Sequence, residues 1–241
     1  MPDFAVFTEN LGKFFGGFQA VKNLNLAVEY GEIFGFLGAN GAGKTTAIRM
    51  LCGLLMPSSG SGAVAGFDIF KQGEKIKRHI GYMSQKFSLY EDLTIEENIE
   101  FYGGVYGLAR PQLLAKRQDL LQDLGLSQQA STLTHDLPLV YKQRLALGCA
   151  LLHDPKIVFL DEPTGGVDPE ARRNFWNLIH AMAEQGKTVF VTTHYMDEAE
   201  YCNRVSIMYQ GEIIALDRPE ALKKQYGQTS MQDVFIHLVD R

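Results

Sequence analysis

The chain has 241 residues, which is enough for one large domain or a core with a subdomain, but too few for two independent domains. Its content of 46% hydrophobic and 21% charged residues is that of a globular protein, which excludes a fibrous or disordered chain. The formal net charge is −5 and there is no basic run, so we expect no nucleic acid among its partners.

The sequence predicts neither an export signal nor a membrane span. The start, Met1-Pro2-Asp3, lacks the basic and apolar segments of a signal peptide, and no apolar run approaches the roughly 18 residues that a span needs. The cysteines Cys52, Cys149 and Cys202 lie far apart without metal-binding spacing, which predicts buried thiols in a reducing compartment. We therefore expect a cytoplasmic chain that works at a membrane only through a partner.

The N-terminal part predicts an antiparallel sheet. Apolar residues alternate or cluster at Phe4 to Thr8 and at Asn25 to Tyr30, around turn glycines. Between them, Lys13 to Phe18 places three aromatic side chains in a Gly-rich loop. One of these rings could stack on a nucleotide base, or the rings could fill the core of the small sheet. The residues alone leave both interpretations open.

A phosphate-binding loop lies between an apolar strand and a helix. Ile33 to Leu37 suits a buried parallel strand, and Thr46 to Leu55 has helical spacing. Between them, Gly38 to Thr46 matches G-x-x-x-x-G-K-[ST], in which backbone N–H groups and a lysine hold phosphates at a helix N-terminus. The motif predicts ATP or GTP, with Mg²⁺ on Thr45. The residues expected to bind the nucleotide here are Gly38, Asn40, Gly41, Ala42, Gly43, Lys44, Thr45 and Thr46.

The middle of the chain predicts an inserted helical subdomain. An extended segment, Arg78 to Gln85, places Gln85 at a strand end. Residues 94–126 then have helical spacing, with three glutamates in the first turns. A further helix is predicted from Val140 to His153, where Asp154-Pro155 stops it.

Polar residues at strand ends complete the predicted site. The apolar strand from Lys156 to Leu160 is followed by Asp161 and Glu162, one carboxylate for a metal and one to orient or deprotonate water. His194 ends a strand that begins at Thr188 and could contact a γ-phosphate, although a single histidine is more often structural.

The alternation of strands and helices predicts a mostly parallel α/β sheet with its chemistry at the carboxyl ends of the strands. Val205 to Tyr209 is a further strand of this sheet, and Gly211 to Ile214 a hairpin-like element. Two terminal helices, Pro219 to Tyr226 and Ser230 to Val239, are predicted to follow. The apolar residues of the last helix should dock on the core.

These motifs, in this order, resemble the nucleotide-binding subunit of an ABC transporter, and most closely the drug- and polymer-exporter group. The resemblance covers nearly the whole chain. Its elements are the loop Gly38 to Thr46, Gln85 at the Q-loop, Leu160 to Thr164 as Walker B, Asp168 in the D-loop and His194 as the switch histidine.

The resemblance implies a P-loop NTPase (RecA-like) α/β fold in a single domain, with a core of about 1–85 and 154–241 and a helical subdomain of about 86–153. It implies ATP hydrolysis with Mg²⁺ held by Thr45, Gln85 and Asp161, and with Glu162, His194 and Gln85 as catalytic residues. Phe15 would stack on adenine. The implied partners are a second ABC cassette and an integral membrane permease, which would hold the chain on the inner face of the cell membrane.

One motif departs from the family pattern. The signature usually reads Leu-Ser-Gly-Gly-Gln, whereas the sequence here is Leu137-Pro138-Leu139-Val140-Tyr141. The hydroxyl is lost, and branched side chains replace the bare backbone that approaches a γ-phosphate. We therefore expect a sound nucleotide pocket but an impaired signature surface, and a partner cassette that differs from this chain.

Two other classes of protein remain as alternatives. A member of the same ATPase superfamily could act without a permease, but such members usually carry twin cassettes or long coiled-coil or basic insertions. A small-molecule kinase or GTPase could share the phosphate loop. Neither of these explains Gln85, the Leu160 to Thr164 run and His194 together, and the chain has no Asn-Lys-x-Asp motif to read guanine.

Overall fold

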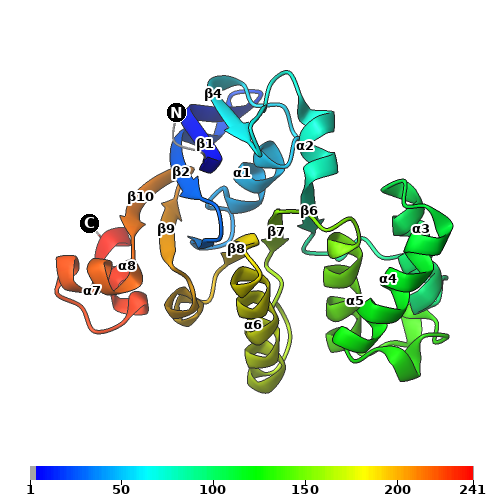
Figure 1. Cartoon of the computed structure of the whole chain (residues 1–241). Helices are drawn as coiled ribbons and strands as arrows, with labels where there is room; N and C mark the ends of the chain where they lie inside the picture. Colours follow the sequence, from blue (N-terminus) through cyan, green and yellow to red (C-terminus); the bar gives the residue numbers. More distant parts are fainter. Residues whose placement is uncertain (1–3, 241) are drawn as a thin grey trace.

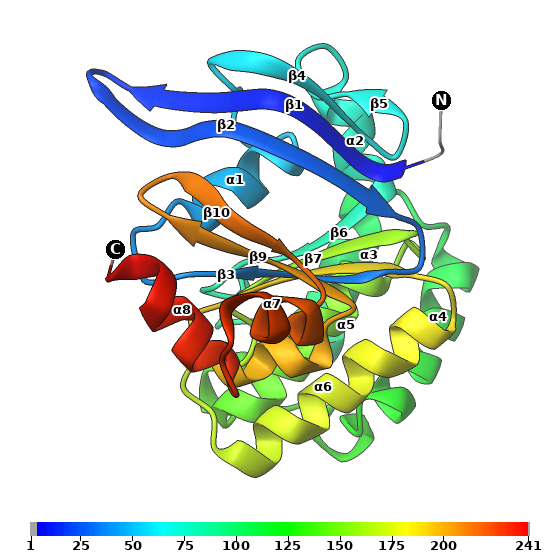
Figure 2. The same ribbon diagram turned by 90° about the vertical axis from the view of Figure 1, so that its left-hand side faces the viewer.

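The computed structural model describes residues 4–240, so the start Met1-Pro2-Asp3 lies outside the described part. The chain forms two sheets that face each other across helix α1 (Figure 1, Figure 2). The smaller sheet is antiparallel, with strand order β2-β1-β4-β5. Its strands are β1 (Phe4–Phe15), β2 (Phe18–Glu29), β4 (Ser59–Val64) and β5 (Phe67–Asp68).

The larger sheet has the order β10-β9-β3-β8-β7-β6 and is parallel from β9 to β6, with β10 antiparallel at its edge. Its central strands β3, β7 and β8 are buried along their whole length, because helices or the other sheet cover both faces. The predicted α/β fold, mostly parallel with an antiparallel N-terminal layer, is confirmed. The strands are β3 (Ile33–Leu37), β6 (Ile80–Met83), β7 (Ile157–Asp161), β8 (Thr188–Thr193), β9 (Arg204–Tyr209) and β10 (Glu212–Asp217).

Helices pack on both faces of the larger sheet. α1 (Lys44–Leu51) lies in the layer between the sheets, where one hydrophobic core includes Phe34, Phe36 and Ile48. A second core lies on the opposite face, where α6 buries Phe175, Trp176, Ile179 and Met182 at helical spacing. The other helices of the sheet domain are α2 (Gly73–His79), α6 (Pro169–Glu184), the 3₁₀ helix η3 (Met196–Tyr201), α7 (Pro219–Tyr226) and α8 (Met231–Val239).

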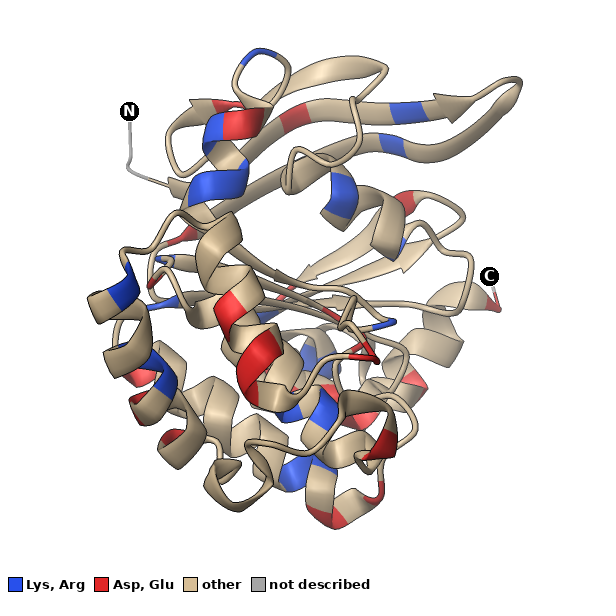
Figure 3. Ribbon diagram, turned by 90° about the vertical axis from the view of Figure 1, so that its right-hand side faces the viewer, with Lys and Arg blue, Asp and Glu red and all other residues tan. Residues whose placement is uncertain are grey.

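A group of helices beside β6 has a hydrophobic core of its own (Figure 1). This core includes Ile95, Ile99, Leu121 and Leu145. On the face shown in Figure 3, basic and acidic residues are interspersed over these helices and do not gather by sign. The helices are α3 (Ile95–Val105), α4 (Arg110–Asp123), α5 (Leu139–Leu151) and the short η1 (Ser127–Gln129) and η2 (Thr134–Asp136).

The prediction of an aromatic loop from Lys13 to Phe18 is wrong. β1 continues to Phe15 and β2 begins at Phe18, so only Gly16 and Gly17 form the turn. Gly16 has φ +57°, as a tight hairpin turn requires. Phe15 and Phe18 are therefore paired directly across the two strands of a hairpin.

Three helix boundaries also differ from the prediction. The helical stretch 94–126 is two helices, because Gly107 adopts φ +72° after α3 and Arg110-Pro111 starts α4. α1 ends at Leu51 and not at Leu55, just before Gly53, which has φ +68°. The helix predicted from Val140 to His153 is α5, which begins one residue earlier, at Leu139, and ends two residues earlier, at Leu151.

The cysteines are free and buried, as predicted, and burial raises the pKa of each thiol. A buried thiol with a raised pKa is a poor nucleophile, so these side chains contribute packing. Among the helices of residues 4–240, none combines the length and apolar character that a bilayer crossing needs.

Gly103 and Gly104 are neighbours in α3 that differ in packing. A Cβ on Gly103 would lie 2.3 Å from Leu113 Cδ1, whereas a Cβ on Gly104 would meet nothing within 4 Å. Because Leu113 must shift, we expect Gly103→Ala to have a free energy of unfolding about 1–3 kcal/mol below that of Gly104→Ala. Gly104→Ala itself should be more stable than the parent by about 0.5–1 kcal/mol through helix propensity. Chemical denaturation of both variants measures the difference, and equal stabilities would contradict the packing of α4 on α3.

Candidate nucleotide site

The phosphate loop joins the buried carboxyl end of β3 to the first residue of α1. Gly43 precedes the helix with φ +108°, and a Cβ there would lie 2.7 Å from the carbonyl oxygen of Ala20. Only glycine fits this position. No side chain caps the helix, so its first backbone N–H groups stay available to an anion.

The ammonium group of Lys44 lies inside this loop. Its Nζ donates hydrogen bonds to the carbonyl oxygens of Gly38 (2.8 Å) and Ala39 (3.2 Å). It also lies 3.3 Å from Glu162 Oε1, and only 4% of the lysine side chain is exposed. A buried ammonium held by two carbonyls and one carboxylate is already placed for phosphate oxygens, which would replace these partners.

Glu162 is the residue on which the predicted polar side chains converge. Gln85 Nε2 donates to Glu162 Oε2 (3.1 Å), and His194 Nδ1 lies 3.2 Å from the same oxygen. The backbone of Glu162 is left-handed (φ 50°), and its N–H donates to Thr192 Oγ1 (2.8 Å). This hydrogen bond helps to hold a conformation that costs a non-glycine residue of the order of 1–3 kcal/mol. The structure therefore brings Lys44, Gln85, Glu162 and His194 together.

Asp161 lies beneath this group and is 1% exposed. Its Oδ1 accepts hydrogen bonds from Thr192 Oγ1 (2.7 Å) and Thr45 Oγ1 (3.2 Å). Burial raises the pKa of this carboxyl, and the two threonine hydroxyls partly offset that shift. The oxygens of Asp161 and Thr45 are hard ligands of the kind that Mg²⁺ prefers, and Gln85 lines a cavity together with Thr45. These donors fit a magnesium site that a nucleotide's phosphate oxygens would complete.

Two phenylalanines form the far end of the same cavity, which has a volume of about 340 Å³. Phe15 is 49% exposed and Phe18 is 66% exposed, and both line the cavity together with the phosphate loop. The resemblance names Phe15 as the stacking residue and does not single out Phe18. The signal that could have found Phe18 is its cross-strand pairing with Phe15, which becomes apparent only once the glycines are read as a hairpin turn.

Comparison with known proteins agrees with this geometry. Residues 21–165 match the family model described as "ABC transporter". The chain is 38% identical over 220 residues to the linearmycin resistance ATP-binding protein LnrL of Bacillus subtilis, which covers 91% of this chain and 71% of LnrL. The chain belongs to the ABC transporter family. It is an ATP-binding cassette with the ATPase fold of that family.

Other relatives extend the likeness. A probable multidrug ABC transporter ATP-binding protein of Escherichia coli, YbhF, is 50% identical over 236 residues, which is 96% of this chain but only 41% of YbhF. This chain thus spans less than half of that relative. A solved ATP-binding subunit of an ABC transporter has a TM-score of 0.87 at 25% identity, covering 98% of this chain and 99% of its own. A dimeric cassette bound to ADP and Pi has a TM-score of 0.81 at 25% identity, covering 88% and 98%.

The signature segment of this cassette is not part of the cavity lined by the phosphate loop. Leu137 is buried, Pro138 and Leu139 are exposed, and Val140 and Tyr141 are half-buried at the start of α5. Leu139 packs beside Gly166, because a Cβ on that glycine would lie 3.4 Å from Leu139 Cδ2. Gly166 lies two residues before Asp168, whose side chain caps α6. The signature and D-loop segments therefore adjoin each other, and neither lines the cavity beside this chain's own phosphate loop.

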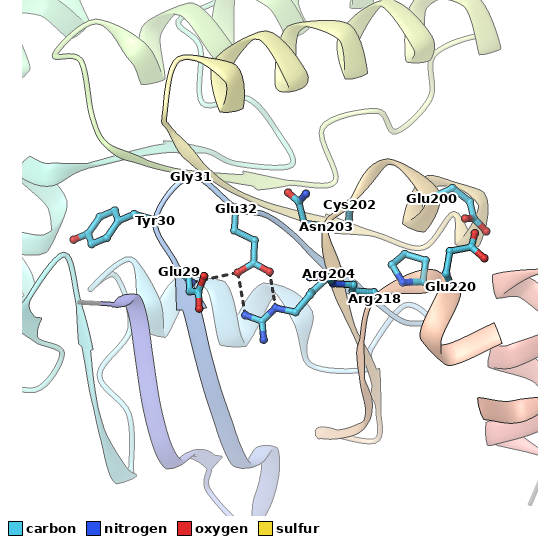
Figure 4. A pocket seen from close by; sticks show the side chains of 11 residues that line it. Glu29, Tyr30, Gly31, Glu32, Glu200, Cys202, Asn203, Arg204, Arg218 and Glu220 are labelled. Carbon is cyan, nitrogen blue, oxygen red and sulfur yellow. Dashed lines mark hydrogen bonds and ion pairs between the residues drawn. The ribbon is translucent and has the colours of Figure 1, made fainter. Parts of the chain in front are cut away.

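A cavity of about 870 Å³ lies at the opposite end of the strands, where β3 and β9 begin (Figure 4). Three of its carboxylates form ion pairs with basic residues of the chain. Arg204 binds both oxygens of Glu32 at 2.6 and 2.9 Å, and Lys223 pairs with Glu200 and Glu220. Four carboxylates and two guanidinium groups line this cavity, so its net charge does not favour phosphate.

Stacking on the base should depend on both rings. We expect Phe15→Ala and Phe18→Ala each to weaken ATP binding by about 1–3 kcal/mol, or roughly 5- to 150-fold, because each ring offers an apolar face to a base. Titration with ATP by calorimetry measures the effect. Phe14→Ala is the matched control, since Phe14 is 44% exposed but does not line the cavity. Unchanged affinity in Phe18→Ala would contradict its role.

Proposed function

We propose that this cassette binds and hydrolyses MgATP and that ATP-driven closure of a cassette dimer powers a membrane-spanning exporter. The observation that carries the proposal is the convergence of Lys44, Gln85 and His194 on Glu162, above a phosphate loop. The names of relatives support export, since they include a probable multidrug transporter, linearmycin resistance and Nod factor export.

In this proposal, Lys44 and the loop N–H groups hold the β- and γ-phosphates, and Thr45, Gln85 and Asp161 hold Mg²⁺. The metal neutralises charge that develops on the phosphate oxygens. Glu162 orients and deprotonates the attacking water, and His194 contacts the γ-phosphate. Phe15 and Phe18 stack on the base.

The resting contacts suggest an order of events. Lys44 must leave Glu162 to bind phosphate, because one ammonium group cannot keep all its present partners and the nucleotide. Its departure frees Glu162 Oε1, while Gln85 and His194 still hold Oε2. Binding of ATP would thus expose the oxygen that acts as the general base.

The signature segment supports a partner that differs from this chain. Pro138 has no N–H to donate, and the side chains of Leu139 and Val140 cover backbone that would otherwise meet the partner's γ-phosphate. In a dimer with a cassette that carries Ser-Gly-Gly, one composite site would hydrolyse ATP and the other would mainly hold it. Asp168 and Leu137 to Tyr141 would lie at that interface.

Contact with the permease is proposed for the helical subdomain of about 86–153, which would move as a unit against the core of about 1–85 and 154–241. Phe87, Leu89 and Tyr90 follow Gln85 along the chain. Of these, Tyr90 is 47% exposed and packs edge-on to Phe101, with ring centroids 4.5 Å apart, whereas Phe87 and Leu89 are half-buried. Tyr90 and Phe101 are therefore the better candidates for contact with a coupling helix of the permease.

The chain would then lie on the inner face of the cell membrane, held by the permease. The alternative is an ABC-type ATPase that acts without one. Affinity purification from detergent-solubilised membranes separates the two, since the proposal expects an integral membrane protein in stoichiometric amount. A chain recovered only from the soluble fraction would contradict the transporter role while leaving MgATP hydrolysis open to direct assay.

A further inference from the structure

Arg172 joins helix α6 to the segment that carries the switch histidine. Its guanidinium carbon lies 3.8 Å from the centroid of the Tyr195 ring. The rings of Tyr195 and His194 are in turn packed together, with centroids 4.2 Å apart and planes at 35°. His194 Nδ1 reaches Glu162 Oε2 at 3.2 Å. The Tyr195 ring therefore lies between Arg172 and His194, and His194 contacts Glu162, the proposed general base.

A buried carboxylate fixes the position of this arginine. Glu198 is fully buried and accepts a hydrogen bond from Thr164 Oγ1 (2.7 Å). Arg172 Nε lies 3.6 Å from Glu198 Oε1, and its Nη1 lies 3.6 Å from Asp197 Oδ2. Among residues 4–240, neither Arg172 Nε nor Glu198 Oε2 has a hydrogen-bond partner. The pair is thus held by charge, and the arginine compensates a carboxylate that would otherwise be isolated.

The elements that meet at Arg172 all begin beside the proposed site. Thr164 lies two residues after Glu162, and Tyr195 directly follows His194. Arg172 itself is in the first turns of α6, where its N–H donates to the carbonyl oxygen of Asp168 (3.0 Å). A displacement of the D-loop would therefore move the guanidinium against the Tyr195 ring.

We propose that Arg172 is a positioning residue that sets the orientation of His194 through the Tyr195 ring and couples it to the D-loop. The inference rests on the proposed contact of His194 with the γ-phosphate. ADP has no γ-phosphate, so the effect of Arg172 should be confined to ATP. Loss of the stacked guanidinium should lower turnover and reduce the preference for ATP over ADP.

Arg172→Lys tests this proposal, because lysine keeps the charge beside Glu198 but loses the planar group over the ring. We expect kcat to fall roughly 3- to 30-fold and the affinity for ADP to stay within about twofold of the parent. Arg173→Lys, the exposed neighbour on the same helix, is the matched control and should behave as the parent.

The single tryptophan supplies a readout of folding. Trp176 lies one turn after Arg172, is 1% exposed and stacks on Tyr201 of η3, with centroids 5.1 Å apart. Its fluorescence in the ADP complex should be parental in Arg172→Lys if α6 and η3 remain packed. A changed emission together with weakened ADP binding would overturn the positioning role in favour of a structural one.

A double-mutant cycle with His194→Ala completes the test. If Arg172 acts through His194, Arg172→Lys should have no further effect on kcat in the His194→Ala background. An effect of equal size in both backgrounds would overturn this inference and leave the proposed role of His194 intact. Parental turnover in His194→Ala would overturn the proposed role of His194 and this inference with it.

Discussion

Replacing Glu162 with glutamine should lower steady-state ATP turnover by a factor of about 10²–10⁴, the usual contribution of a general base. The amide keeps the size of the side chain and can still contact Gln85 and His194, so the pocket should remain intact. What it loses is the ability to accept a proton from water. The loss should therefore appear in kcat.

ATP should bind to Glu162→Gln at least as tightly as to the parent. In the resting structure Lys44 lies 3.3 Å from Glu162 Oε1, and this ion pair competes with phosphate for the ammonium group. Glutamine weakens that competition, because a hydrogen bond to a neutral amide is weaker than one to a carboxylate. The variant should thus accumulate bound ATP.

Calorimetric titration and a phosphate-release assay on the same preparation separate the two effects. Glu184→Gln, an exposed carboxylate at the end of α6, serves as the control and should change neither quantity. Parental turnover in Glu162→Gln would show that another group takes the proton. A large loss of ATP affinity would show that Glu162 holds the nucleotide instead.

The phosphate loop and the carboxylate pair could be predicted from sequence because their chemistry lies in consecutive residues. Gly38 to Thr46 and Asp161-Glu162 follow fully apolar strands, and such runs indicate buried parallel strands whichever neighbours they pair with. The placement of Gln85 is different. It meets Glu162 across 77 positions, and only the resemblance to a known family assigned Gln85 to the same site.

The hairpin and the arginine network could not be predicted in the same way. Two glycines among aromatic residues favour a loop, and what overrides this is the pairing of β1 with both β2 and β4. No local motif marks Arg172, Tyr195 and Glu198. Their contacts join helix α6, which precedes β8 in the chain, to the segment that follows β8. Such long-range contacts appear only in the folded chain.

Restoring the signature should raise the turnover of the chain alone. In the triple variant that combines Pro138→Ser, Leu139→Gly and Val140→Gly, the new serine supplies a hydroxyl and a backbone N–H. The two glycines leave the backbone uncovered. One preorganised donor of this kind is worth about 10²–10³ in rate, so we expect an increase of that order where copies of the chain meet head to tail.

The three substitutions should lower the free energy of unfolding only slightly. Serine is a good helix N-cap, worth about 1 kcal/mol at the position that Pro138 occupies. Glycine at the first two positions of α5 costs up to about 1 kcal/mol each. Loss of the Leu139 contact with Gly166 adds to this cost, but that side chain is 41% exposed. The net change should therefore leave the cassette folded, and thermal unfolding checks it.

Dimer formation can be measured apart from chemistry by adding Glu162→Gln to both backgrounds, so that bound ATP is not consumed. Sedimentation with MgATP should then show a dimer for the restored variant and a monomer for the parent. The signature segment can bind the partner's γ-phosphate only through backbone N–H donors, and Pro138, Leu139 and Val140 either lack them or cover them. Leu114→Ser, at an apolar residue that is 39% exposed on α4, controls for a general gain in surface polarity. A parent that dimerises with ATP and turns over as fast as the restored variant would refute an impaired signature and, with it, the need for a different partner cassette.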